Sequence, residues 1–182
     1  MSIDASAFKK AMRRLTASVT VITTRHQDIR GGLTATAFCS VSADPAHILI
    51  CVNGSASAHG LIKSAGYFCV NILTPDQRQV AERFAGMDGV KGDKRFVGLG
   101  AWSVLTTGAS ALKDRSACFD CRTVSAVVTG THTIYIGEVA DIALDSERQS
   151  LIYCDGAFMN GENLRRAAHA QDFQLGPTGE QQ

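Results

Sequence analysis

S-V-T-V-I-T-T at Ser18–Thr24, followed by L-T-A-T-A-F-C-S-V at Leu33–Val41, is the stretch that decides the fold. Both runs are rich in β-branched residues, which favour strands because their side chains pack well on a pleated sheet. Polar residues and glycines connect the two runs over His26–Gly32. This arrangement predicts a β-hairpin.

Five further runs of apolar and β-branched residues have the length of strands. Turn residues separate them, among them the Asp44-Pro45 pair and Gly130. The runs are His47–Val52, Tyr67–Leu73, Ala117–Val128, Thr133–Ile142 and Leu151–Cys154. Closely spaced strands joined by tight turns favour an antiparallel sheet that closes on itself. We therefore predict a mainly β protein, a β-barrel with a few peripheral helices.

Three segments have the pattern of helices. Asp4–Leu15 opens with a capping aspartate and has apolar residues three and four positions apart. Ser57–Ser64 is the second helical stretch, and the third starts at Pro75 and stops near Gly86. The following segment, Gly86–Gly100, carries five glycines among charged residues. That composition predicts a mobile surface loop near a ligand rather than a packed element.

Composition and charge exclude several classes of partner. The formal net charge is +1 and the charges are scattered, so the sequence offers no basic stripe for nucleic acid. No apolar stretch approaches the roughly 20 residues needed to cross a bilayer, and the first residues do not resemble a signal peptide. We expect a cytoplasmic protein with no nucleic acid or membrane partner, one domain at residues 1–161, and a polar, partly disordered tail at residues 162–182.

Six cysteines raise the question of a disulfide framework or a metal site. Cys39, Cys51 and Cys69 lie in apolar strand-like runs, where cysteine usually acts as a small buried hydrophobe. Cys118 and Cys121 have the C-x-x-C spacing of redox and zinc motifs, but residues three apart in a strand point to opposite faces. We predict free thiols and no metal.

The standard nucleotide-binding signatures, G-x-G-x-x-G after a strand and G-x-x-x-x-G-K-[ST], are absent from the sequence. The informative segment is Gly31–Ser42, G-G-L-T-A-T-A-F-C-S-V-S, in which small and hydroxyl residues follow one another near a strand end. Small side chains let a flat aromatic ligand approach the backbone, while hydroxyl and N–H groups offer hydrogen bonds. An ordinary edge strand is the commoner origin of such a run.

A second segment, N-G-S-A-S-A-H at Asn53–His59, follows a strand and begins a helix. Asn53, Ser55 and Ser57 can cap that helix without any ligand. The same geometry also makes a helix N-terminus with N–H groups and hydroxyls that suit a phosphate. The two interpretations are compatible.

Gly130-Thr131-His132 places a histidine at the entrance to a predicted strand. A lone histidine there is more often structural than functional. Neither a Ser/His/Asp nor a Cys/His catalytic signature is recognisable. The residues alone therefore predict a barrel with a site for an anionic cofactor.

Taken in order, these segments resemble the short-chain flavin reductase family, especially the reductase component of 4-hydroxyphenylacetate 3-monooxygenase. The resemblance covers about Phe8 to Phe158 and is carried by F-K-K-A-M, V-T-V-I-T-T, G-G-L-T-A-T-A-F-C-S-V-S, I-L-I-C-V-N, F-C-V-N-I-L, E-R-F-A-G-M, F-D-C-R and G-T-H. It implies a homodimeric, antiparallel, Greek-key FMN-binding split β-barrel with flavin at the subunit interface. It also implies an NAD(P)H:flavin oxidoreductase, which uses NADH or NADPH to reduce FMN or FAD and passes reduced flavin to a partner monooxygenase by diffusion.

The resemblance further implies roles for individual residues. Those along the isoalloxazine ring would be Thr34, Ala35, Thr36 and Ala37. Those toward the ribityl chain and phosphate would be Ser40, Asn53, Ser55 and Ser57, with Arg83 and Arg95 as candidates for the phosphate charge. His132, the catalytic candidate, would lie beside the nicotinamide, with Phe158 near the same pocket.

The implied reaction is hydride transfer from nicotinamide C4 to flavin N5. It needs the two rings stacked at about 3–3.5 Å and little acid–base help, so positioning does most of the work. Backbone N–H groups near Thr36 and Ala37 could favour the negative charge that develops on the reduced flavin. Two positions depart from the common family pattern: Thr131 where many members have Asp, and Ala46 where many have Pro.

The sequence leaves two alternatives open, because a fold does not settle a function. One is a flavin-binding module without reductase activity, such as a sensor or carrier. The other is a related barrel enzyme that reduces a corrinoid or oxidises a pyridoxine phosphate. The choices between FMN and FAD and between NADH and NADPH also stay open, because no ribose-reading motif is visible.

Overall fold

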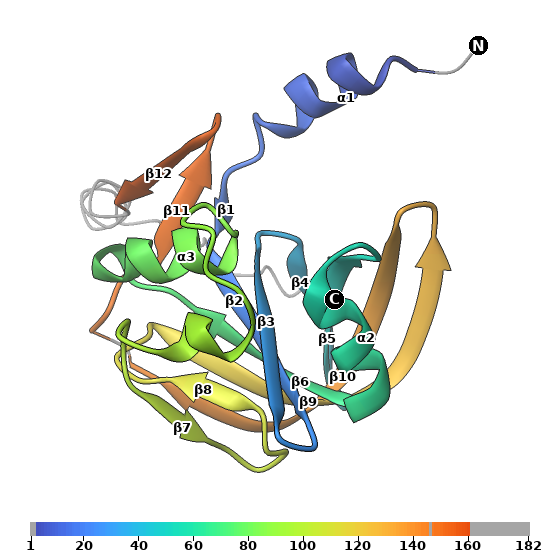
Figure 1. The fold of residues 1–182 in the computed structure, drawn as a ribbon. Coiled ribbons are helices and arrows are strands. Elements are labelled where there is room, and N and C mark those ends of the chain that lie inside the picture. The colour runs from blue at the N-terminus through green and yellow to red at the C-terminus, as the bar shows by residue number, and fades with distance from the viewer. Residues whose placement is uncertain (1–2, 146, 161–182) are drawn as a thin grey trace, which may run out of the picture.

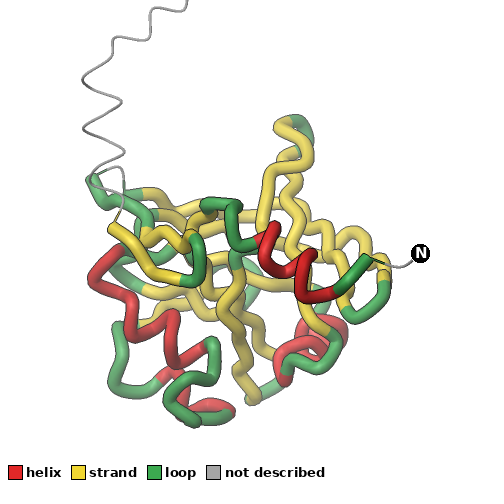
Figure 2. Tube along the Cα trace, turned by 90° about the horizontal axis from the view of Figure 1, so that it is seen from above, coloured by secondary structure: helices red, strands yellow, loops and turns green. Residues whose placement is uncertain are grey.

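The computed structural model describes residues 3–145 and 147–160, and its largest element is a seven-stranded antiparallel sheet. In spatial order the strands are β3 (Ile29–Ala35), β2 (Thr20–His26), β6 (Tyr67–Ile72), β9 (Ala117–Thr129), β10 (His132–Leu144), β5 (Ala46–Asn53) and β4 (Phe38–Ala43). Two small sheets complete the structure: β1 (Ala17–Ser18) with β11 (Leu151–Cys154) and β12 (Ala157–Asn160), and β7 (Trp102–Val104) with β8 (Ser110–Leu112). The prediction of a mainly β protein with peripheral helices is confirmed (Figure 1, Figure 2).

Four central strands form a Greek key. β6, β9 and β10 lie side by side, and β5, which precedes β6 in the chain, lies on the far side of β10. All three neighbouring pairs are antiparallel. The long hairpin of β9 and β10 contains a bulge beside Gly137, whose position cannot hold a side chain because a Cβ atom would lie 2.6 Å from the Phe68 ring. The Greek-key order implied by the family resemblance is therefore present.

The predicted hairpin is confirmed, but its second strand is shorter than the sequence suggested. β3 begins at Ile29, inside the expected connection, and ends at Ala35. Thr36 and Ala37 interrupt the run, and β4 then pairs with β5 at the opposite edge of the sheet. β3 and β4 are the two edge strands of the sheet, and because only two residues join them, the two edges meet at this corner. Within the described residues, however, β3 and β4 do not pair with each other. Within the described residues the sheet therefore does not close, which corrects the expectation of a sheet that closes on itself. The split at this corner agrees with the split barrel that the family resemblance implies.

The first helix, α1 (Ala5–Met12), starts as predicted, because the Asp4 carboxylate accepts a hydrogen bond from the Ala7 N–H at 3.0 Å. It ends three residues before the predicted end at Leu15. Its apolar residues do not join a core in this chain: Phe8 is 58% exposed and Met12 46%. Figure 1 shows α1 projecting away from the sheets.

The other two predicted helices are α2 (Ser57–Ala65) and α3 (Arg78–Phe84), the latter preceded by the short 3-10 helix η1 (Pro75–Gln77). Both contact β3. At Gly31 an added Cβ would lie 2.4 Å from Leu61 of α2, and at Gly32 it would lie 2.7 Å from Phe84 of α3. The two glycines therefore let the helices approach the strand.

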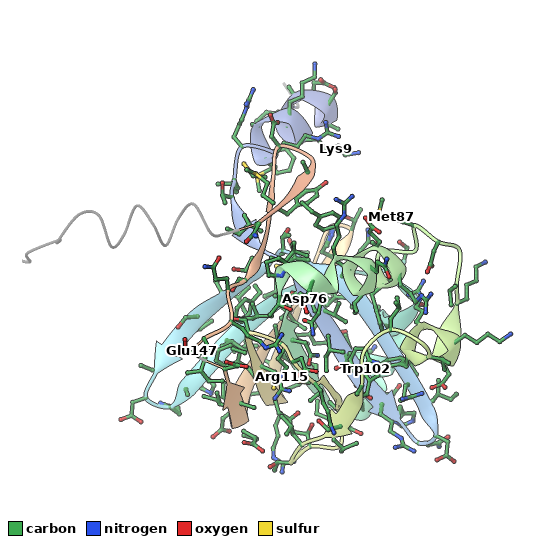
Figure 3. The ribbon with its side chains drawn as sticks, turned by 90° about the vertical axis from the view of Figure 1, so that its left-hand side faces the viewer. Lys9, Asp76, Met87, Trp102, Arg115 and Glu147 are labelled. Atoms are coloured by element: carbon green, nitrogen blue, oxygen red, sulfur yellow. The ribbon has the colours of Figure 1, made fainter. Side chains whose placement is uncertain are left out.

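Gly86–Gly100 lies mostly at the surface beside the two clefts, as predicted, but the expectation that it does not pack is wrong. The segment contains the 3-10 helix η2 (Gly92–Phe96), and its Phe96 is 4% exposed. The Phe96 ring lies 5.0 Å from that of Phe84 and 4.9 Å from that of Trp102, centroid to centroid. One aromatic residue among the glycines thus anchors the segment to the core, and Figure 3 shows where Trp102 lies.

All six cysteines are free, as predicted. Cys118 and Cys121 lie in different core clusters, so the sulfurs diverge as the strand pattern required. Burial raises the pKa of Cys121 to about 12, whereas a hydrogen bond from Cys69 lowers that of Cys118 to about 7. No cluster of three metal-binding side chains occurs within residues 3–145 and 147–160.

In the part of the chain that the structure describes, no helix is long and apolar enough to cross a membrane. The prediction for residues 162–182 concerns a segment outside the described residues.

Candidate functional site

A cleft of about 600 Å³ opens at the corner between β3 and β4. This volume lies within the roughly 300–1,000 Å³ that is usual for small-molecule sites. The corner segment Thr34–Ala37 forms one part of its lining, and Tyr153 and Phe158 of the β11–β12 hairpin form another. Residues of α3 and the turn after it form the rim, including Met87, which Figure 3 labels.

Backbone groups dominate the corner wall. The Thr34 hydroxyl donates to the Ala81 carbonyl of α3 at 2.6 Å, so it anchors the strand instead of facing a ligand. The Thr36 and Ala37 carbonyls accept from the N–H groups of Phe38 and Cys51 at 3.1 and 3.0 Å. Within the described residues the N–H groups of Thr36 and Ala37 have no acceptor. Two backbone donors are therefore available beside small, exposed side chains.

His132 and Asn53 lie next to each other at the other end of the cleft. They are directly opposite in the β10–β5 register, so their side chains share one face of the sheet. Both line the cleft, and His132 is exposed. Its Nδ1 lies 2.8 Å from the Thr131 hydroxyl. The exposure excludes the alternative in which His132 is a core histidine.

The polar residues before α2 do not cap it, which corrects the capping prediction. The N-cap is Ala56, and no side chain accepts a hydrogen bond from the first turn. Asn53 instead closes its own turn, because its Oδ1 accepts from both the N–H and the hydroxyl of Ser55 at 2.9 Å. The helix begins at Ser57, which was itself expected to cap it, and the other two expected caps lie in the turn before it. Within the described residues, the N-terminal N–H groups of α2 thus have no side-chain partner.

Ser57 and Arg95 meet in a second cleft of about 550 Å³. Gly31 and Gly32 of β3 line this cleft, while the next three residues of the same strand line the first, so the two clefts are neighbours. Arg95 donates to the carbonyls of Val90 and Gly32 at 2.9 and 3.3 Å. With Lys91 it makes this second cleft basic.

Three predicted site residues lie outside both clefts. Ser40 is exposed on β4, and Ser55 is held in the turn at Asn53. Arg83 donates to the Asp88 carboxylate at 2.7 Å and to the Val97 carbonyl at 2.7 Å. Its hydrogen bond lowers the pKa of Asp88 below the usual range. Arg83 therefore ties the segment after α3 to the helix and does not face either cleft.

Sequence reasoning missed several residues that line the main cleft, namely Arg78, Glu82, Met87, Cys51 and Tyr153. Arg78 and Glu82 had a usable signal, because opposite charges four residues apart share one helix face. The others are brought to the cleft by packing between distant segments, which local patterns do not reveal.

An open Greek-key sheet with a ligand-sized cleft at its split, next to a basic cleft, defines a split-barrel protein whose clefts fit a small molecule with an anionic group. The chain belongs to the flavin reductase like domain family, which matches residues 12–162.

Three similar proteins illustrate the relationship. FMN reductase (NADH) RutF of Variovorax paradoxus (strain S110) is 40% identical over 148 residues, which are 81% of each chain. The structure of the flavin reductase PheA2 in its native state has a TM-score of 0.79 at 32% identity and covers 87% of this chain and 98% of its own. BorF, the flavin reductase component of a bacterial two-component tryptophan halogenase, has a TM-score of 0.78 at 31% identity and covers 86% of this chain and 97% of its own.

Proposed function

We propose that this protein is an NADH:flavin oxidoreductase that reduces FMN or FAD and supplies the reduced flavin to a partner monooxygenase. The observation that carries the proposal is the corner at Thr36–Ala37: both residues line a cleft of about 600 Å³, both have small side chains, and their backbone N–H groups have no acceptor within the described residues. The names of the similar proteins support it, since one is an NADH-dependent FMN reductase and another is a component of a two-component system.

The residues present fit a flavin. A flat ring system can lie against Ala35, Thr36 and Ala37, because their side chains are too short to hold it away from the backbone. The neighbouring basic cleft, with Ser57, Arg95 and the N-terminus of α2, suits the phosphate. When bound, flavin supplies the ring that accepts a hydride. The N–H groups of Thr36 and Ala37 would stabilise negative charge on that ring without a side-chain acid.

The remaining part of the cleft suits the nicotinamide. His132 lines it from the β10 side, and Phe158 closes it from the β11–β12 hairpin. The Thr131 hydroxyl beside Nδ1 restrains the imidazole ring of His132. Hydride transfer moves no proton to or from a side chain, so the role we assign to His132 is to position the nicotinamide.

We also infer that the protein acts as a homodimer. Helix α1 has eight residues, and a helix of that length is not stable alone in water. Its apolar side chains face a groove of about 420 Å³ that also reaches Tyr153, Thr36 and Ala37. A second copy that covers α1 would bury these side chains next to the flavin cleft.

The dimer is tested by light scattering at micromolar concentration. We expect the Phe8→Asp/Met12→Asp double variant to become monomeric, because it places charge on the apolar face. Lys10→Ala, on the same helix but not among the residues that line this groove, should stay dimeric. A fully active monomeric wild-type protein would contradict the inference.

The activity is tested by following NADH and NADPH oxidation spectrally with FMN, FAD or riboflavin present. We expect NADH oxidation only when a flavin is added. Flavin binding without NADH oxidation would instead identify a non-catalytic flavin-binding module. Reduction of a corrinoid, or oxidation of a pyridoxine phosphate, in preference to flavin turnover would point to the related barrel enzymes.

A further inference from the structure

The rim of the main cleft carries an ion pair that has no role in the reaction described so far. Arg78 and Glu82 lie one turn apart on α3, with the Arg78 Nε 2.8 Å from the Glu82 Oε1. Both line the cleft. The two arginines first expected to bind phosphate lie elsewhere: Arg83 is paired with Asp88, and Arg95 lines the second cleft. Within the described residues, Arg78 is the only lysine or arginine that lines the main cleft.

The geometry leaves the Arg78 guanidinium available to a ligand. Its side chain is 60% exposed, against 30% for Glu82. The ion pair uses Nε, and the two terminal nitrogens have no hydrogen-bond acceptor among residues 3–145 and 147–160, so they can donate to a ligand. The guanidinium carbon lies 5.4 Å from the centre of the Phe158 ring, within cation–π range. Phe158 and Glu82 thus hold the guanidinium at the entrance while its terminal donors can meet an anion.

We propose that Arg78 binds the pyrophosphate of the nicotinamide cofactor and that Glu82 both orients Arg78 and weakens this attraction. The inference rests on the proposed function, because it assumes that the cleft receives a nicotinamide dinucleotide. Guanidinium groups suit phosphate oxygens, which they contact through paired N–H donors.

The position of Arg78 distinguishes the two anionic ligands. The flavin phosphate has a separate basic cleft at Ser57 and Arg95, next to the N-terminal part of β3. Arg78 instead lies on α3 beside Phe158 and lines the main cleft. A dinucleotide whose nicotinamide stacks between the corner and Phe158 would leave by this rim, where its pyrophosphate would meet Arg78.

The ion pair makes the proposal testable, because the direction of the change in NAD⁺ affinity differs between a structural role and a binding role. If Arg78 and Glu82 only stabilise α3, then Arg78→Gln and Glu82→Gln should change the NAD⁺ affinity in the same direction, because each variant breaks the same ion pair. If Arg78 binds pyrophosphate, the variants should act in opposite directions. Arg78→Gln removes the attractive charge, whereas Glu82→Gln removes the competing carboxylate. Glutamine is about as good a helix former as arginine or glutamate, so α3 should persist in both.

The experiment titrates NAD⁺ and FMN separately against the wild type and both variants by calorimetry, with the KM for NADH measured in parallel. We expect Arg78→Gln to weaken NAD⁺ binding roughly tenfold, the usual loss for a charge-assisted contact. Glu82→Gln should strengthen NAD⁺ binding about two- to threefold. FMN affinity should change less than about twofold in both variants. Arg25→Gln is the matched control, because Arg25 forms a similar exposed pair with Asp28 at the β2–β3 turn.

Salt provides a second readout. Raising the ionic strength should weaken NAD⁺ binding to the wild type more than to Arg78→Gln, since screening acts on the charge that the variant lacks. Changes of the same sign in both variants, or a loss of FMN affinity instead of NAD⁺ affinity, would overturn the proposal. A wild-type protein that binds NAD⁺ but oxidises no NADH would refute the proposed reductase function while leaving the role of Arg78 measurable. A wild-type protein that binds no NAD⁺ would refute both.

Discussion

The pair Gly31–Gly32 and the corner Thr36–Ala37 lie within seven residues of each other and are both built from small side chains, yet for different physical reasons. At Gly32 an added Cβ would lie 2.7 Å from Phe84 and 2.9 Å from the Ile22 carbonyl. At the corner the side chains are exposed and line a cleft. The glycines are therefore small so that helices can pack on β3, whereas the corner residues are small so that a ligand can reach the backbone. A sequence motif can thus combine a packing requirement with a binding requirement.

Ala37→Leu should produce the largest effect. The added atoms would occupy the cleft at the corner, and we expect the Kd for FMN to rise at least about 100-fold, or ~2.7 kcal/mol. Because Ala37 is exposed, the free energy of unfolding should change by less than ~0.5 kcal/mol. Flavin fluorescence titration and urea denaturation measure the two quantities. Val41→Leu, at an exposed position of β4, is the control, and normal FMN binding by Ala37→Leu would place the flavin elsewhere.

Gly32→Ala should show the opposite pattern. We expect a loss of about 2 kcal/mol in the free energy of unfolding, because the new methyl group meets backbone and a buried ring. FMN affinity of the folded protein should stay within about threefold, because the new methyl group would lie against Phe84 and the Ile22 carbonyl although Gly32 lines the second cleft. Gly60→Ala is the matched control, since nothing lies within 4 Å of an added Cβ in the middle of α2. That variant should gain stability by up to ~1 kcal/mol. Equal losses of unfolding free energy in Gly32→Ala and Ala37→Leu would contradict the distinction between a packing role for Gly32 and a binding role for the corner.

The sequence predicted most strands because neighbouring segments of the chain pair in hairpins, and alternating β-branched runs report that local pairing. It did not predict the break at Thr36–Ala37, since the Thr-Ala-Thr-Ala run also suits a continuous edge strand and contains no glycine or proline to mark an interruption. It also missed β7, β8 and β12, each only three or four residues long. These strands depend on contacts with distant segments rather than on a periodic pattern.

The site was predicted in part, and mainly through the family resemblance. Corner residues, Asn53, His132 and Phe158 do gather at one cleft. The roles of the arginines were harder to predict, because Arg78 and Arg83 lie on the same short helix and look alike in sequence. What separates them is the loop after α3, which brings Asp88 to Arg83 and leaves Arg78 facing the cleft.

Ser55 lies in the turn before α2 and Ser57 is the first residue of the helix, and we expect the two serines to differ in their effect on flavin binding. Ser57→Ala should weaken FMN binding about tenfold and riboflavin binding less than twofold, because only FMN carries a phosphate for the second cleft. Ser55→Ala should change the affinity for FMN and the affinity for riboflavin by the same small amount, since the Ser55 hydroxyl donates to Asn53 and not to a ligand. Parallel titrations of the two flavins provide the measurement. An equal loss for FMN and riboflavin in Ser57→Ala would make that serine structural.

The smallest effect is expected from His132→Ala. An exposed side chain that positions the nicotinamide should raise the KM for NADH about three- to fivefold and lower the rate of hydride transfer, while FMN affinity and Tm stay close to those of the parent. His59 is the matched control, because its Nε2 lies 2.8 Å from the hydroxyl of the buried Thr133 and its ring packs at 5.9 Å from that of Tyr135.

His59→Ala should therefore lower Tm with little change in the KM for NADH, which is the reverse of the His132→Ala pattern. Single-turnover mixing of NADH with the flavin-loaded protein, together with a melting curve for each variant, measures both effects. If His132→Ala left NADH kinetics unchanged, the histidine would have no part in the site, and the cleft wall around Phe158 would have to position the nicotinamide without it.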